Sequence, residues 1–355
     1  MKWLALMLMT APAMAQTSNK LHQKAIVVDT HNDFPSAAIN KGVSLDMSLK
    51  GKTHSDLDRL QQGGVDVQIF SIWCDGDKKE PYAWANREID SVHAWAQRNP
   101  QRMMLVGNPK ELEQAVRQKK LATMMGVEGG HMIEDDLGKL EALYNRGVRY
   151  MTLTWNNSTA WATSALDETK PGFTGKKGLT DFGKAVVKKM NELGMLVDLS
   201  HVGEQTFYDA MATTSKPVLV SHSCVHALCP IFRNLKDDQI KAIGKNGGVI
   251  HLNFFSGFVD STFMPRYTAF LTKRKTELDS LVAANPQIDK DYLEMQLLDK
   301  YKEETLALRP TLDQLMDHMD YIVKLVGIDH VGLGSDFDGI SSAPQGLDGV
   351  ENFPL

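Results

Sequence analysis

The sequence predicts a (β/α)8 barrel with a helical insertion after the seventh strand, and two observations support this fold class. Eight apolar runs rich in Val, Ile, Leu and Met alternate with amphipathic or helix-start segments, a rhythm typical of βα units in a parallel sheet. The chain has 355 residues, whereas such a barrel typically needs about 250 plus insertions. We therefore expect one barrel domain over residues 16–355.

The eight expected strands follow one another in order along the chain. They are residues 26–31, 65–73, 121–127, 148–154, 195–200, 217–222, 248–253 and 330–335. The expected helices are 55–60, 81–98, 136–146, 179–193, 204–212, 235–245 and 311–325. Because active sites of such barrels lie at the carboxyl ends of the strands, polar residues at the ends of these runs are the first candidates.

Two segments interrupt this rhythm. Residues 155–178 are rich in Asn, Ser, Gly and Pro and follow the fourth strand, so we expect a rim or lid on the active-site face. Residues 256–310 follow the seventh strand and are charged and helical in pattern. Three interpretations of this insertion stay open: a cap over the barrel mouth, a dimer contact, or a solvated helical hairpin with no part in the chemistry.

Composition narrows the class of protein. Hydrophobic residues make up 43% and charged residues 23%, enough apolar side chain for a full core. The formal net charge is −5 and the basic residues are scattered, which argues against a nucleic-acid partner. No stretch reaches the roughly 18 apolar residues that a membrane span requires.

The N-terminus resembles a signal peptide. Lys2 is followed by an apolar run from Trp3 to Thr10, and Ala13-Met14-Ala15 has the small-x-small pattern that signal peptidase accepts. Residues 1–15 are therefore predicted to be removed on export to the periplasm or the extracellular space, leaving a soluble chain; the alternative is an uncleaved N-terminal helix. Three cysteines, Cys74, Cys224 and Cys229, are interpreted as structural, since an odd count leaves one thiol free.

Five residues of metal-ligating type come where apolar runs end. They are His31, Asp33, Glu128, His201 and His222. The i, i+2 spacing of His31 and Asp33 places both on one side of an extended strand end, and glycines around Glu128 let the chain turn sharply there. Any one of these histidines alone is more often a hydrogen-bonded or surface residue. Together at one barrel mouth, they can bind two divalent ions with Glu128 bridging.

Two further groups are candidates for proton transfer and for substrate binding. Asp336, in GLGSDFDG at the end of the eighth strand, is placed to take a proton from water and give it to a leaving amine. Asp338 is its rival, although it can equally form the turn before Gly339. Arg233, in the loop after the sixth strand, suits a substrate carboxylate, although a surface salt bridge is the commoner fate of an arginine.

These residues stand in blocks that resemble the renal or membrane dipeptidase family of zinc peptidases, peptidase family M19, over nearly the whole chain. The blocks are VDTHNDFP, GVEGGHMIEDDLGKL, RYMTLTW, LVDLSHV, SHS, RNLKDD and GLGSDFDG. The resemblance implies a barrel with His31 and Asp33 on one zinc, His201 and His222 on the other, and Glu128 bridging. It also implies a metal-bridging hydroxide as nucleophile, Asp336 as proton carrier, and Arg233 holding the free C-terminal carboxylate of a dipeptide.

Three departures from the family pattern qualify this resemblance. Trp155 stands where the family has a substrate-contacting histidine, and Phe255 stands where a tyrosine is expected. The chain also stops at Leu355, before relatives end, so that a closing C-terminal helix is expected to be missing. We expect Trp155 to narrow the substrate pocket, with Asn156 or Asn157 taking over the polar contact; core packing of Trp155 without substrate contact is the alternative.

The predicted function is an exported binuclear zinc dipeptidase that uses two Zn²⁺ per chain, with the homodimer that relatives suggest. Another amidohydrolase acting on a lactam, lactone or phosphoester is the alternative within enzymes, because the same metal pair serves these reactions. A metal-binding protein with weakened catalysis is the second alternative, which the presence of Asp336 disfavours.

Overall fold

The computed structural model describes residues 20–286, 288 and 290–355. The predicted signal peptide, residues 1–15, lies outside this range. Among the described residues, no helix combines the length and the apolar character that crossing a membrane requires.

Eight parallel strands close into a barrel, so the predicted fold class is confirmed. The sheet runs β2-β1-β9-β8-β7-β6-β5-β4, and the pairing of β2 with β4 closes it. The strands are β1 (Val28–Asn32), β2 (Val67–Trp73), β4 (Leu121–Glu128), β5 (Val148–Thr152), β6 (Leu196–Asp198), β7 (Leu219–Val220), β8 (Val249–Leu252) and β9 (Val331–Leu333). Each overlaps one of the eight predicted strands.

A further strand, β3 (Met103–Leu105), was not predicted. It pairs with the first residues of β4, from Leu121 to Thr123, while β5 takes over the same edge of β4 from Met125 onward. Three residues are too few to show an apolar pattern, so sequence periodicity cannot find such a strand.

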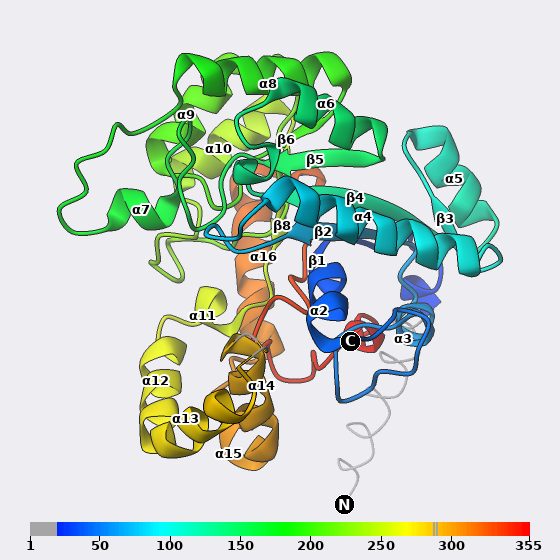
Figure 1. Ribbon diagram of the computed structural model, residues 1–355, viewed down its shortest axis with the longest axis vertical. Coiled ribbons are helices and arrows are strands. Elements are labelled where there is room, and N and C mark those ends of the chain that lie inside the picture. Colours follow the sequence, from blue (N-terminus) through cyan, green and yellow to red (C-terminus); the bar gives the residue numbers. More distant parts are fainter. Residues whose placement is uncertain (1–19, 287, 289) are drawn as a thin grey trace, which may run out of the picture.

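Helices surround the barrel and connect its strands (Figure 1). They are α2 (Phe34–Lys41), α3 (Leu57–Gln62), α4 (Pro81–Arg98), α5 (Pro109–Arg117), α6 (Leu137–Asn145), α7 (Ala165–Thr169), α8 (Asp181–Leu193), α9 (Glu204–Thr213), α10 (Asp237–Asn246) and α16 (Leu312–Val326), with short 3-10 turns η1 (Gly130–Ile133), η2 (Ile328–His330) and η3 (Val350–Asn352). The predicted helices overlap all of the α-helices except α2, α5 and α7. A signal for α5 was present, because Asn108 caps it and Pro109 occupies its first turn.

The predicted insertion is helical. Between β8 and β9 it forms α11 (Ser256–Val259), α12 (Phe263–Lys273), α13 (Lys275–Ala284), α14 (Lys290–Lys300) and α15 (Lys302–Leu306). Figure 1 shows α12 to α15 gathered beside the barrel, on the side away from α6 and α8. These helices share a small hydrophobic core of their own, which contains Phe263, Tyr267, Phe270, Leu278, Leu293, Leu297 and Leu298.

Close packing inside the barrel positions one polar side chain. Tyr150 is fully buried, and its ring lies against Gly126, where an added Cβ would come within 2.0 Å of a ring carbon. Only glycine at position 126 permits this approach. The packing brings the Tyr150 hydroxyl within 2.7 Å of His31 Nδ1.

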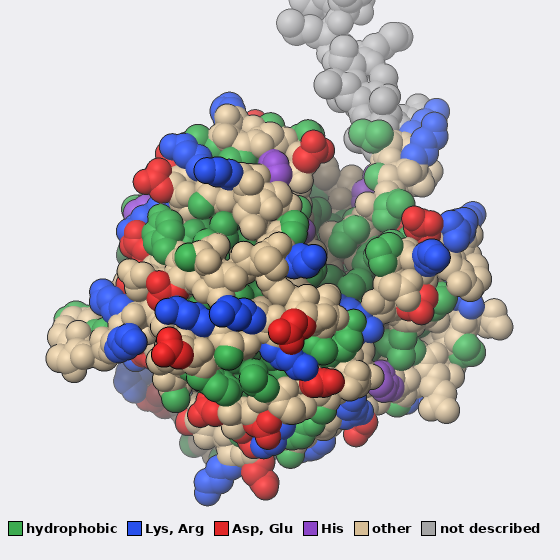
Figure 2. All heavy atoms as spheres, turned by 90° about the horizontal axis from the view of Figure 1, so that it is seen from above, with side chains coloured by type: hydrophobic (Ala, Val, Ile, Leu, Met, Phe, Trp, Pro, Cys, Tyr) green, Lys and Arg blue, Asp and Glu red, His purple; other side chains and the backbone are tan. Residues whose placement is uncertain are grey.

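Charged side chains of both signs lie on the face of the molecule seen from above. Lys and Arg are interspersed there with Asp and Glu (Figure 2).

Candidate metal centre

The structure brings all five predicted metal ligands together at the barrel mouth. His31 lies in β1 and Glu128 ends β4, while Asp33 comes just after β1. His201 and His222 lie in the turns after β6 and β7, further from the strands than predicted, because both strands are shorter than their apolar runs. His201 adopts a φ of 63°, a strained conformation that non-glycine residues rarely take and that clusters at functional sites.

Glu128 stands between two groups of ligands. Its Oε1 lies 2.8 Å from His201 Nε2 and 3.4 Å from His222 Nε2, and those two nitrogens are 3.0 Å apart. Its Oε2 lies 3.4 Å from His31 Nε2, which is 3.6 Å from Asp33 Oδ2. One carboxylate oxygen thus faces each group, the geometry of a bridging ligand.

Hydrogen bonds fix the tautomers of His31 and His222. The Tyr150 hydroxyl donates to Thr30 O at 3.2 Å, so it accepts from His31 Nδ1–H. The Ser221 hydroxyl donates to Asp198 Oδ2 at 2.6 Å and likewise accepts from His222 Nδ1–H at 2.8 Å. Each Nε2 therefore keeps a lone pair, as a metal ligand requires.

His201 follows the same rule through a different partner. Its Nδ1–H donates to the amide oxygen of Asn156 at 3.1 Å. Its Nε2 is therefore also an acceptor, and it faces the Glu128 carboxylate and the Nε2 of His222. Three acceptors at such distances repel one another unless a cation lies among them. Ligand atoms about 2.0–2.1 Å from a tetrahedral zinc are about 3.3 Å apart, which matches this spacing.

Two buried atoms of the predicted ligands lack hydrogen-bond partners. They are His31 Nε2 and Asp33 Oδ1. Asp33 occupies the N-cap position of α2, yet its carboxylate makes no capping hydrogen bond. A buried polar atom without a partner is costly, so the residues present fit a second bound cation on this side of Glu128.

The electrostatics agree with cation binding. Burial lowers the pKa of His201 to about 4 and the pKa of His222 well below its usual value, so both are neutral at pH 7. Burial alone would also lower the pKa of His31, but Tyr150, Glu128 and Asp33 outweigh it and raise that pKa. A positive charge is therefore favoured beside His31, and a metal ion can supply it in place of the proton.

Asp336 lies beside the ligand cluster. One of its carboxylate oxygens, one nitrogen of His31 and one nitrogen of His222 lie within 4.8 Å of one another. Asn253, which was not predicted, donates from Nδ2 to Asp336 Oδ2 at 2.7 Å. The backbone of Asp336 adopts a φ of 61°. The rival Asp338 instead accepts the backbone N–H of His54 at 2.7 Å, which ties it to a loop.

Asp198 is a further residue of the site that was not predicted from the sequence. It is fully buried and accepts hydrogen bonds from Thr152 Oγ1, Ser221 Oγ, Ser221 N and Ser200 N at 2.5, 2.6, 2.9 and 3.1 Å. Through Ser221 it orients the ring of His222. A signal was present, since a carboxylate inside an apolar strand is expensive to bury without such partners.

His131, His251 and the three cysteines make structural contacts. His131 donates to Cys74 O at 3.1 Å, and His251 donates to Val220 O at 3.0 Å. All three cysteines are free and buried, and burial raises the pKa of the Cys74 thiol to about 12. An uncharged buried thiol is a poor nucleophile.

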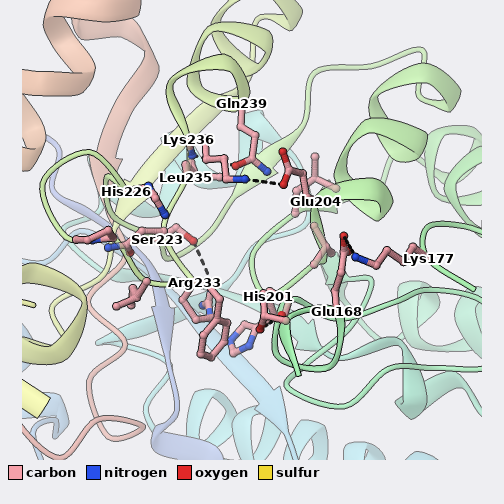
Figure 3. Close-up of a pocket in the computed structure, with 18 residues that line it drawn as sticks. Glu168, Lys177, His201, Glu204, Ser223, His226, Arg233, Leu235, Lys236 and Gln239 are labelled. Carbon is pink, nitrogen blue, oxygen red and sulfur yellow. Dashed lines mark hydrogen bonds and ion pairs between the residues drawn. The ribbon is translucent and has the colours of Figure 1, made fainter. Parts of the chain in front are cut away.

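Arg233 projects between two cavities. It is 4% exposed and donates to Ser223 Oγ and His222 O, each at 3.2 Å, while its Nε has no partner. Burial lowers its pKa to about 10, so it is still a cation at pH 7. Figure 3 shows Arg233 and His201 at one end of a cavity of about 330 Å³, whose other end is lined by Lys236 and Gln239.

The second cavity, of about 420 Å³, is lined by three of the five predicted metal ligands. We call it the reaction cavity. Asp33, Glu128, His201, Arg233 and Asp336 line one part of it. Helices α11, α12 and α14 of the insertion line another part, with Phe258, Met264, Tyr267, Glu294 and Met295. The insertion therefore forms part of the wall of this cavity, and which of its three interpretations holds stays a prediction.

Trp155 and Asn156 both line the reaction cavity. The Trp155 ring packs edge-on against Trp73, with centroids 5.1 Å apart, and lies 6.4 Å from the His201 ring. The amide oxygen of Asn156 is committed to His201, so this residue can position a metal ligand as well as face a substrate.

Exchanges at these two positions should separate the two roles. We expect Trp155→His to change relative kcat/KM values across a dipeptide panel, because indole offers one donor on a larger apolar body. Asn156→Ala should weaken metal affinity by about 10- to 100-fold, as loss of a partner that orients a ligand does. Steady-state kinetics and metal titration measure both. Parent-like values for both variants on every substrate would make the two positions structural.

A parallel barrel with histidines and carboxylates clustered at its strand ends defines a metal-dependent hydrolase. Residues 15–355 match the family described as membrane dipeptidase, peptidase family M19, and the chain belongs to this family. It is a metallo-dipeptidase of the (β/α)8 barrel class.

Individual relatives agree. An uncharacterized dipeptidase of Schizosaccharomyces pombe is 32% identical, over 96% of this chain and 75% of the relative. The probable dipeptidase PvdM from Pseudomonas aeruginosa is 22% identical with a TM-score of 0.74, over 97% of this chain and 91% of that chain. A metallo peptidase from Rhodobacter sphaeroides, solved with a phosphinate mimic of the dipeptide L-Ala-D-Ala, is 22% identical with a TM-score of 0.71, over 93% and 90% of the chains. These two structures are similar to this chain in fold.

Proposed function

We propose that the chain hydrolyses dipeptides with two zinc ions, one held by His31 and Asp33, the other by His201 and His222, with Glu128 bridging. The observation that carries this proposal is the set of three imidazole Nε2 atoms that face Glu128. Each is the nitrogen left without a hydrogen in the neutral ring, because Nδ1 donates its hydrogen to a partner. Imidazole nitrogens and carboxylate oxygens are ligands that zinc accepts.

When bound, the two ions would lower the pKa of the water that attacks the peptide bond and would polarise the scissile carbonyl. The chain itself positions a proton carrier. Burial, together with the charges of Asp33 and Glu128, raises the pKa of Asp336 above its usual value. We assign Asp336 to take a proton from the attacking water and to deliver it to the leaving amine.

Arg233 is proposed to hold the C-terminal carboxylate of the substrate. It is a buried cation in the wall of the reaction cavity, with its Nε unpartnered. A planar guanidinium binds a carboxylate with two parallel hydrogen bonds. When Arg233 binds the C-terminal carboxylate, only a substrate of suitable length can place its peptide bond at Glu128 and Asp336.

Metal content gives the direct test of this function. We expect close to two zinc ions per chain at saturation, hydrolysis across a dipeptide panel with zinc added, and loss of activity on chelation with recovery on adding zinc. Elemental analysis and turnover of the panel measure this. One ion or none, with activity intact after exhaustive chelation, would exclude the binuclear assignment.

Substrate length should depend on Arg233. We expect dipeptides to be cleaved, while their C-terminal amides and tripeptides are poor substrates. Arg233→Met should cost about 2–5 kcal/mol in kcat/KM by leaving the substrate carboxylate unpaired in a desolvated pocket. Arg117→Met, which removes a 68% exposed arginine, is the matched control and should leave kcat/KM unchanged. Equal rates on a dipeptide and its amide would refute this role.

We further propose export with cleavage after Ala15, and assembly as a homodimer. The signal-like pattern of residues 1–15 supports export. N-terminal sequencing of the secreted chain and its mass in solution test the two proposals.

A further inference from the structure

A continuous line of ring contacts runs from Arg233 into the insertion. The Arg233 guanidinium lies 5.2 Å from the centre of the Phe258 ring, and Phe258 packs edge-on against Phe255 at 5.0 Å. Phe255 then contacts Phe263 at 5.9 Å, and Phe263 stacks on Tyr267 at 5.4 Å. The line begins at the proposed carboxylate anchor and follows the insertion side of the reaction cavity.

The line ends on a buried acid. The Tyr267 hydroxyl donates to Glu294 Oε2 at 2.9 Å, and Glu294 is only 8% exposed. Lys290, whose side chain is 61% exposed, lies 2.8 Å from Glu294 Oε1. Glu294 lines the reaction cavity and Lys290 does not, so the negative end of this ion pair faces the cavity.

Two methionines complete this side. Met264 of α12 and Met295 of α14 line the same cavity as Phe258, Tyr267 and Glu294. We call these five residues the insertion wall. Methionine is flexible and fits irregular apolar groups. The wall is thus apolar along its length and carries a carboxylate at one end, and it lies in the same cavity as Asp33, Glu128, His201 and Asp336.

We propose that the insertion wall selects the side chain of the C-terminal residue of the dipeptide, favouring large neutral apolar side chains and disfavouring acidic ones. This inference rests on the proposed function. When Arg233 holds the C-terminal carboxylate, the adjacent Cα and its side chain must lie beside the residues that flank Arg233, of which Phe258 is one. An apolar side chain gains by burial there, and an acidic one meets Glu294.

Relative rates within one enzyme preparation test the apolar part. Dipeptides with alanine first and Gly, Ala, Leu or Phe second, in both configurations, form the panel. We expect the parent to prefer Leu over Gly by at least about tenfold in kcat/KM, as a hydrophobic pocket does for added methylenes. Met295→Ala should reduce this ratio several-fold. Met47→Ala, at a 48% exposed methionine far along the chain from the insertion, is the control and should keep the ratio.

A second variant tests the acidic end. Glu294→Gln keeps a hydrogen-bond acceptor for Tyr267 and removes the charge. It should raise kcat/KM for alanyl-glutamate relative to alanyl-glutamine by about tenfold, equivalent to about 1.4 kcal/mol. These readouts are ratios, so a partly inactive preparation does not alter them.

The outcomes separate the two proposals. A parent that cleaves dipeptides without preference between Leu and Gly, or unchanged ratios in Met295→Ala and Glu294→Gln, would overturn the insertion wall and leave the dipeptidase assignment in place. A zinc-loaded parent that cleaves no dipeptide of the panel would overturn the proposed function, and the wall with it.

Discussion

Replacing Asp336 with Asn should lower kcat by about 10² to 10⁴, the usual contribution of general acid–base catalysis, with zinc content unchanged. Asparagine keeps the shape of the side chain and can keep the contact with Asn253, which lies 2.7 Å from Asp336 Oδ2. It cannot carry the proton. Steady-state kinetics and elemental analysis of the same preparation measure the two quantities.

Asp338→Asn is the matched control, two residues away in the same loop. Its carboxylate accepts a backbone hydrogen bond from His54, so its loss should affect local stability more than kcat. Loss of zinc from Asp336→Asn would contradict the proton-carrier role. It would make Asp336 a metal ligand, because its carboxylate lies close to His31 and His222.

Replacing Asp198 with Asn should destabilise the fold by about 3 kcal/mol and weaken zinc binding by about 10- to 100-fold. Four donors point at this buried carboxylate. The asparagine side chain replaces one of its two acceptor oxygens with an NH2 donor, which faces donors that then have no acceptor. The zinc effect follows because Ser221, which orients His222, loses its own partner. Urea unfolding of chelator-treated protein and zinc titration measure the two effects.

A surface exchange provides the reference for that experiment. Asp238→Asn, at a side chain 85% exposed, should change stability by no more than about 0.5 kcal/mol. If Asp198→Asn behaves like this control in both measurements, the hydrogen bonds around Asp198 carry little energy and His222 is oriented by other contacts.

The clustering of the five candidate ligands could be predicted because the barrel places successive strand ends at one opening. His31 and Asp33 share a strand end, and Glu128 ends another, so topology alone brings them together. The exact positions of His201 and His222 were less predictable. Their apolar runs continue past the hydrogen-bonded part of β6 and β7, which periodicity cannot reveal.

The partners of these ligands could not be assigned in the same way. Tyr150 reaches His31 across 119 positions of sequence, and Asn253 reaches Asp336 across 83. Each contact depends on how neighbouring strands and side chains pack, as with the Tyr150 ring against Gly126. The insertion shows the same limit: its helical pattern was visible, but its place in the reaction cavity depends on tertiary contacts.

The separate core of the insertion has a consequence for how such a chain can diverge. Its helices pack on Phe263, Tyr267 and Phe270, whereas the five predicted metal ligands lie in or just after strands of the barrel. Substitutions in the insertion therefore leave the ligand-bearing strands in place. Related sequences can therefore change the insertion residues that line the cavity while the residues at the barrel mouth stay the same.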